Sequence, residues 1–123
     1  MSDIATNETR ELISSDKVEG TSVYDRNGNK LGTVSNVMLD KRSGQVAYAV
    51  LSFGGFLGMG SNYHPLPWHQ LTYDSNQGGY VVDLTKEQLE GAPTYSASND
   101  ARWDDPAYGR TIDDYYASVE GRR

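Results

Sequence analysis

The first candidates for metal binding are the only two histidines in the sequence, His64 and His69. They stand five positions apart, so an extended segment would place them on opposite faces of the chain. No acidic residue lies within four positions of either histidine. The spacing therefore disfavours a two-histidine metal site, and we expect edge or interface histidines instead.

Two further patterns look like ligand-binding loops. Asp25, Asn27 and Asn29 resemble the start of a calcium loop, but a glycine stands at the fourth position instead of the sixth and the closing glutamate is absent. This pattern is typical of a tight turn in which the Asp and Asn side chains hydrogen-bond the backbone, and we do not expect calcium binding. The glycine-rich residues 54–60 resemble a phosphate cradle, yet Asn62 and two prolines follow where a dinucleotide site needs a helix. We do not expect a nucleotide to bind there.

Nothing in the sequence has the pattern of a catalytic site. The chain has no cysteine, which excludes a thiol nucleophile, a thiolate metal site and a disulfide framework. It has no Gly-x-Ser-x-Gly elbow, and its carboxylates fall mostly in turns. The pairs Asp104-Asp105 and Asp113-Asp114 would attract a cation or the first turn of a helix, or stay solvated, and we favour solvated pairs. We expect a non-enzymatic protein with no cofactor and no metal.

The overall charge narrows the choice of partners. A net charge of -6 and a pI near 4.7 argue against nucleic-acid binding, which needs clustered Lys and Arg. The first residues are acidic where a signal peptide is basic, and no window reaches the roughly 18 apolar residues of a membrane span. We therefore expect a cytoplasmic protein without membrane insertion.

The stretch from 45 to 71 is the centre of the predicted fold. Residues 46–51 are apolar at every position, which predicts a central strand buried on both faces. The glycine-rich residues that follow carry Phe56, Leu57 and Met59, which need an apolar environment. His64 to Pro67 must then be extended, and the prolines favour an edge strand.

The flanking segments predict further short strands. The pattern predicts strands at residues 18–24 and 31–40 that form a hairpin around Asn27-Gly28, with a bulge or bend in the second strand. A turn at 41–44 then leads into the central strand, so that the three strands form an antiparallel meander. Residues 72–74 and 80–83 form another hairpin. Thr85 and Gln88 form a capping box that starts a short helix, which Gly91 and Pro93 end. The result is mainly β: a small antiparallel barrel of about six short strands.

The chain divides into three parts. Residues 1–11 form a flexible lead-in, residues 12–93 the barrel-like domain, and residues 94–123 a C-terminal extension. The extension is rich in aromatic residues, so we expect it to wrap over its own domain or over a second copy. A short helix from about Thr111 to Val119, capped by Thr111, is predicted within it.

Exposed aromatic and apolar residues could form an interface or complete the core. The interface hypothesis gives a protein-interaction module that self-associates as a homodimer, with an unknown protein partner. The second hypothesis is a small-molecule binder or an enzyme, with a pocket between barrel and extension lined by Tyr63, His64, Trp68 and His69. The candidate interaction residues are Phe56, Leu57, Met59, Tyr63, Trp68 and Trp103.

Several motifs in order resemble the PRC-barrel family, named after the cytoplasmic domain of the photosynthetic reaction centre H subunit. The resemblance covers roughly residues 12 to 93. The matching residues are Val23-Tyr24-Asp25-x-x-Gly28-x-x-Leu31-Gly32-x-Val34, Leu39-Asp40-x-x-x-Gly44-x-Val46-x-Tyr48, Gly54-Gly55-Phe56-Leu57-Gly58, Pro65-x-Pro67-Trp68 and Leu71.

The resemblance implies a compact barrel of about six strands in a stand-alone bacterial protein. Members of this family support reaction-centre assembly, or contact a ribosomal protein in a ribosome-maturation factor. The sequence has neither the transmembrane helix of the H subunit nor the N-terminal domain of the maturation factor, so neither role is expected. No catalytic residues define the family, so the resemblance implies none here.

Overall fold

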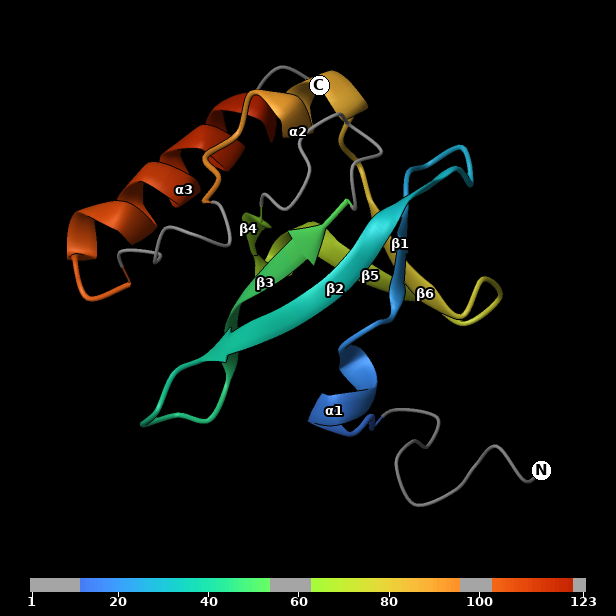
Figure 1. Cartoon of the computed structure of the whole chain (residues 1–123), viewed down its shortest axis with the longest axis horizontal. Helices are drawn as coiled ribbons and strands as arrows, with labels where there is room; N and C mark the ends of the chain where they lie inside the picture. The colour runs from blue at the N-terminus through green and yellow to red at the C-terminus, as the bar shows by residue number, and fades with distance from the viewer. Residues whose placement is uncertain (1–11, 54–62, 96–102, 121–123) are drawn as a thin grey trace.

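The computed structural model describes residues 12–53, 63–95 and 103–120. Six strands form one sheet, in the order β4-β3-β2-β1-β6-β5 (Figure 1). The strands are β1 (Ser22–Tyr24), β2 (Lys30–Leu39), β3 (Val46–Ser52), β4 (Tyr63–Pro67), β5 (Leu71–Asp74) and β6 (Gly79–Val82). The helices are α1 (Ser15–Val18), the 3-10 turn η1 (Trp68–Gln70), α2 (Lys86–Glu90) and α3 (Pro106–Glu120).

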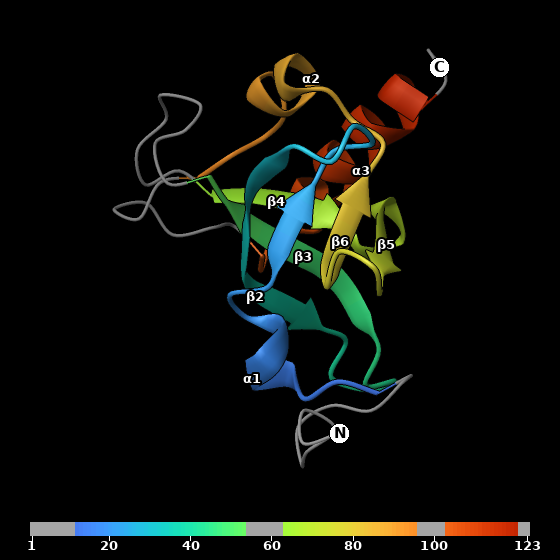
Figure 2. The same ribbon diagram turned by 90° about the vertical axis from the view of Figure 1, so that its right-hand side faces the viewer.

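The sheet is an open, mixed half-barrel, which corrects the predicted antiparallel barrel. Within the described residues β1 and β6 pair in parallel, with Val23 opposite Tyr80, while the other pairings are antiparallel. The curled sheet keeps β4 and β5 as its two edges (Figure 2). Pro65 and Pro67 lack the N–H groups with which β4 would bond a further strand, so β4 ends the sheet as an edge strand, as expected from the sequence.

The first hairpin is shorter than predicted. Val18 ends α1 instead of opening a strand, and its side chain is buried in the core. Gly20 has φ near +87°, which interrupts any extended segment, so β1 begins only at Ser22. The predicted bulge in the second strand is confirmed: the register of β2 against β3 shifts between Val34 and Asn36 and again before Leu39.

The predicted burial of the third strand on both faces is confirmed in its second half. Ala49, Val50 and Leu51 are consecutive and all fully buried, so both faces of β3 are covered there. Cross-strand partners point to the same face of a sheet. One face of β3 and β4 therefore carries Tyr48, Val50, Pro65 and Pro67, and the other carries Ala49, Leu51, His64 and Leu66.

The helix of the extension is longer than predicted and starts earlier. α3 begins at Pro106, and Asp105 accepts a hydrogen bond from the Ala107 N–H at 2.9 Å. Asp105 is thus the capping residue, and a proline follows at the position where its missing N–H is harmless. Thr111 lies inside the helix, where its hydroxyl donates to the Ala107 carbonyl.

The C-terminal helix packs against β4 of the same chain. Ile112, Tyr116 and Val119 are 0, 0 and 1 % exposed and belong to the hydrophobic core. The Tyr115 hydroxyl donates to the Gln88 carbonyl, which ties α3 to α2. In the described part of the chain, no helix is long and apolar enough to cross a membrane.

Candidate interaction surface

Five half-buried aromatic side chains gather where the extension meets the sheet. We call this set the aromatic cluster; its members are Tyr48, Tyr63, Tyr95, Trp103 and Tyr108. Its ring centroids lie 5.3 Å apart between Tyr63 and Tyr95, 5.2 Å between Tyr48 and Trp103, and 5.1 Å between Trp103 and Tyr108. These are packed arrangements in which the rings also keep part of their surface in water.

Backbone contacts fix the cluster to the edge of the sheet. Tyr63 and Tyr95 exchange two backbone hydrogen bonds, at 2.6 and 3.0 Å. This isolated bridge brings the start of the extension alongside β4, next to the two prolines that prevent a full strand from pairing there. Trp103 lies just before α3, and Tyr108 lies in its first turns. The cluster therefore joins three segments that are far apart in the sequence.

The Tyr48 hydroxyl links the cluster to α3. It donates to Asp113 Oδ1 at 3.1 Å, and the Gly109 carbonyl oxygen lies 3.4 Å away. Burial, and then the Asp113 carboxylate, raise the pKa of Tyr48 to about 12. The phenol is therefore protonated at neutral pH and remains a hydrogen-bond donor.

The pKa values of two further phenols of the cluster, those of Tyr95 and Tyr108, are raised as well. Burial, followed by the neighbouring Tyr63, raises the pKa of Tyr95, which a hydrogen bond from Trp103 partly offsets. Burial and then Tyr95 raise the pKa of Tyr108. The cluster therefore presents partly exposed aromatic rings, while the Tyr48 hydroxyl is bonded to Asp113 and the Tyr108 hydroxyl is buried. Aromatic rings of this kind are enriched at protein interfaces.

The structure brings together only part of the residue set selected from the sequence. Tyr63 and Trp103 lie in the cluster. Trp68 lies in η1, where it packs edge-on against Tyr80 at 5.4 Å and contacts the core. Phe56, Leu57 and Met59 lie outside the described residues. Sequence analysis counts Tyr95 and Tyr108 only among the aromatic residues of the extension and assigns Tyr48 to the central strand, because no local spacing relates these three residues.

The two histidines are far from equivalent. His64 is fully buried and packs edge-on against Phe53 at 4.6 Å, and within the described residues neither ring nitrogen has a hydrogen-bond partner of normal geometry. Burial lowers the pKa of His64 to about 4, which a backbone contact with Leu89 only partly offsets. His69 is exposed in η1. The two side chains therefore occupy opposite environments.

The loop that contains Asp25 is the predicted hydrogen-bonded turn. Asp25 Oδ1 accepts hydrogen bonds from the backbone N–H groups of Asn27 and Asn29, each at 2.9 Å. Gly28 has φ near +86°, as a tight hairpin requires. The carboxylate thus stabilises the turn between β1 and β2.

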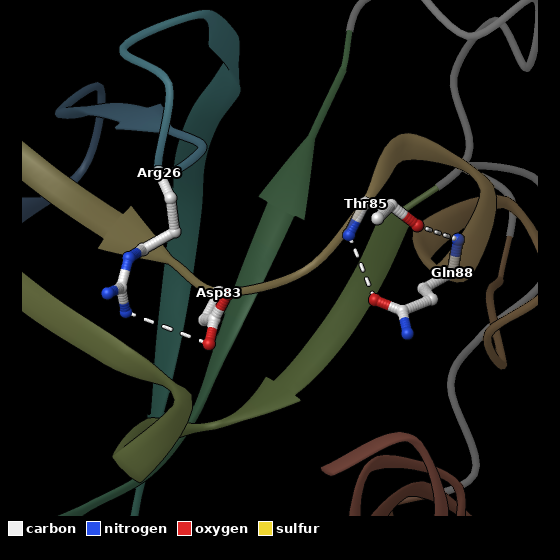
Figure 3. A network of polar contacts seen from close by, with 4 residues as sticks. All are labelled: Arg26, Asp83, Thr85 and Gln88. Carbon is white, nitrogen blue, oxygen red and sulfur yellow. Dashed lines mark hydrogen bonds and ion pairs between the residues drawn. The ribbon is translucent and has the colours of Figure 1, made fainter. Parts of the chain in front are cut away.

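A hollow of about 390 Å³, lined by both polar and apolar groups, lies beside the β5–β6 hairpin. At its rim Arg26 and Asp83 form an ion pair at 3.6 Å, with both side chains exposed (Figure 3). An exposed pair of this kind contributes little stability. The residues expected to line a pocket, Tyr63, His64, Trp68 and His69, are not part of this hollow. Its lining residues are Arg26, Gln70, Thr72, Tyr73, Asp74, Ser75, Val81 and Asp83.

Comparison with known proteins gives two matches. The family model for the PRC-barrel domain matches residues 10–89, well over half of the chain. An uncharacterised protein of Deinococcus radiodurans is 27% identical over 78 residues, which cover 63% of this chain and 27% of that protein. The chain thus spans under a third of the length of this relative. Trp103, Tyr108 and the whole of α3 lie beyond the part that matches the family.

Proposed function

The chain belongs to the PRC-barrel domain family, and from this premise we propose that it is a non-enzymatic protein-interaction module that self-associates as a homodimer. The aromatic cluster is the observation that supports this proposal. Tyr and Trp are enriched at protein interfaces, and they dominate the affinity when they lie near the centre of the contact. Five such rings that keep part of their surface exposed form a suitable centre for an interface.

Light scattering of the full chain across a concentration series tests the proposal. We expect the mass to rise toward that of a dimer, and Trp103→Ala to weaken the association about tenfold or more, as loss of an interface anchor does. Tyr73→Ala is the matched control, since Tyr73 is an exposed aromatic residue outside the cluster. Circular dichroism checks that both variants are folded.

Two outcomes would contradict the proposal. A wild-type chain that stays monomeric at every concentration excludes self-association, and a dimer that Trp103→Ala leaves unchanged excludes the aromatic cluster as its interface. The glycine-rich segment is tested separately with the double substitution Phe56→Ser and Leu57→Ser. Weaker association of that variant would add residues 54–60 to the interface.

Small-molecule binding is the second candidate function, and the hollow beside β5 and β6 is the observation that favours it. A fragment screen followed by amide chemical shifts tests it. Shifts confined to Thr72, Asp74 and Asp83, and lost in Asp83→Ala, would support this function. Fragments that cause no shift at these residues would exclude it.

A further inference from the structure

Tyr63 and Tyr95 stand directly opposite each other at the edge of the sheet. Their backbones exchange two hydrogen bonds, so they form an antiparallel pair whose side chains lie on the same face. The ring centroids are 5.3 Å apart, and the ring planes are tilted by 35°. The backbone bridge therefore holds two phenols from distant parts of the sequence beside each other.

Both residues of this pair keep part of their surface in water. Burial raises the pKa of Tyr95, and the neighbouring Tyr63 adds to this rise, which places the two hydroxyls within electrostatic reach of each other. Rotation of a tyrosine ring about χ2 is soft, so a small turn of each ring brings the ring carbons beside the two hydroxyls closer together. A reagent in water reaches both rings, and the rings can reach each other.

Two other tyrosine pairs in the described part of the chain differ in both respects. Tyr73 and Tyr80 meet at 74°, and Tyr115 and Tyr116 meet at 88°, so in each pair the edge of one ring faces the plane of the other. One partner of each pair is buried, since Tyr80 is 4 % and Tyr116 0 % exposed. A reagent in water therefore reaches at most one ring of each of these pairs.

We propose that Tyr63 and Tyr95 are an oxidative crosslinking site, at which a one-electron oxidant joins the two rings by a carbon–carbon bond and forms dityrosine. Each phenol loses one electron and one proton, and the two radicals couple at the ring carbons beside their hydroxyls. The hydrogens on these carbons then move to the oxygens, which restores two phenols. With a peroxidase, hydrogen peroxide takes up the two electrons and the two protons and is reduced to two molecules of water. The inference does not rest on self-association, because both rings belong to one chain.

A bond at this site fastens the start of the extension to β4. The chain contains no cysteine, so a disulfide cannot form there. The new bond closes a loop from Tyr63 to Tyr95 that includes β5, β6 and α2. Because a crosslink restricts the unfolded chain more than the folded one, the crosslinked protein should unfold at a higher urea concentration than the unmodified protein.

Treatment of the full chain with a peroxidase and hydrogen peroxide tests the site, at the lowest concentration of the light-scattering series. We expect a product with the mass of one chain less two hydrogen atoms and with the fluorescence of dityrosine. Trypsin cleaves after lysine and arginine, which leaves Tyr95 as the only tyrosine of the peptide 87–102 and places Tyr63 in the peptide 43–86. Mass spectrometry should find these two peptides joined, with fragment masses that locate the bond at Tyr63.

Two variants and an unfolded sample are the controls. Tyr95→Phe removes one phenol and keeps the ring, so it should abolish the joined peptides, while circular dichroism checks that the variant is folded. Tyr73→Phe removes the exposed phenol of another pair and should leave their yield unchanged. Oxidation in urea should lower the yield about tenfold or more, because unfolding removes the proximity of the two rings.

Four results would overturn the inference. Equal yields in urea and in buffer would show that the fold does not bring the two rings together. Dityrosine found only between chains would exclude a site within one chain. Addition of oxygen at Trp103 without a crosslink would show that indole oxidation replaces the coupling. An unchanged urea midpoint in the crosslinked protein would show that the bond does not fasten the extension to β4.

Discussion

His64 occupies a core position that a hydrocarbon side chain would fill without a polar cost. Its ring is fully buried against Phe53, and burial holds its pKa near 4 in the folded state. In an unfolded chain the pKa of histidine is about 6.5. Between these two values the unfolded state binds more protons than the folded state. The free energy of unfolding therefore has its full value, as far as His64 is concerned, above about pH 6.5, and it falls as the pH drops toward 4.

Removal of this side chain should remove the acid sensitivity. In the wild type we expect the free energy of unfolding to fall by about 3 kcal/mol between pH 6.5 and pH 4, in addition to the effect of the carboxylates. His64→Leu should flatten this part of the profile, measured by urea unfolding at a series of pH values. His69→Leu is the comparison, because it removes the exposed histidine and leaves the buried one in place. Equal slopes in all three proteins would show that His64 is solvated.

The sequence predicted the position of His64 in the sheet but not its environment. Two nearby prolines identified an edge strand, and β4 is one. An edge strand is buried only if something covers it, and here α3 packs on β4 while Leu89 of α2 contacts His64. Both covering segments lie more than twenty positions further along the chain. Local spacing carries no information about such contacts.

At the scale of strands, Gly32 sets how closely β2 approaches the end of β3. A Cβ at this position would lie 2.4 Å from the Ser52 carbonyl oxygen and 2.7 Å from a ring carbon of Phe53. Gly32→Ala should therefore destabilise the protein by about 3 kcal/mol, as overpacking does. Gly28→Ala is the comparison: nothing lies within 4 Å, and only its positive φ costs about 1 kcal/mol. Denaturant unfolding measures both, and similar losses would contradict the close contact at Gly32.

The start of α3 can be tested by two substitutions. Asp105→Ala removes the side chain that caps the helix, and we expect a loss of about 1 kcal/mol. Thr111→Ala removes a hydroxyl from the helix interior, where Ala is the better helix former, so stability should stay the same or rise slightly. Thermal unfolding compares the two variants. The reverse order would place the start of the helix at Thr111, as the sequence alone predicted.

The elements that sequence analysis predicted well are those with local signals. The Thr85–Gln88 capping box is present, with Gln88 N–H donating to Thr85 at 3.0 Å and the Gln88 side chain accepting from Thr85 N–H at 2.9 Å (Figure 3). The parallel pairing of β1 with β6 has no such signal, because no turn joins the two strands. The early start of α3, by contrast, does have a local signal in the sequence. Asp105-Pro106 is a typical helix start, but sequence analysis assigns Asp105 to a solvated acidic pair with Asp104.

At the scale of the whole molecule, the net charge of -6 opposes any contact between two copies. Salt screens such repulsion, since the Debye length falls from about 20–30 Å at low ionic strength to a few Å near 1 M. We therefore expect self-association to strengthen severalfold between about 20 and 500 mM NaCl, measured by sedimentation equilibrium. Trp103→Ala should reduce association at both salt concentrations. Association that weakens with salt would indicate ion pairs across the interface and argue against an aromatic one.

The parallel pairing of β1 with β6 has a consequence for synthesis of the chain. Strands β1, β2 and β3 are joined by short turns and can pair as soon as they leave the ribosome. Val23, however, meets its second neighbour, Tyr80, only when β6 has been made. Until then the apolar face of the β1–β2–β3 meander stays exposed, and chaperones bind exposed apolar surface of this kind. Folding on the ribosome should therefore be completed late, after the last strand has emerged.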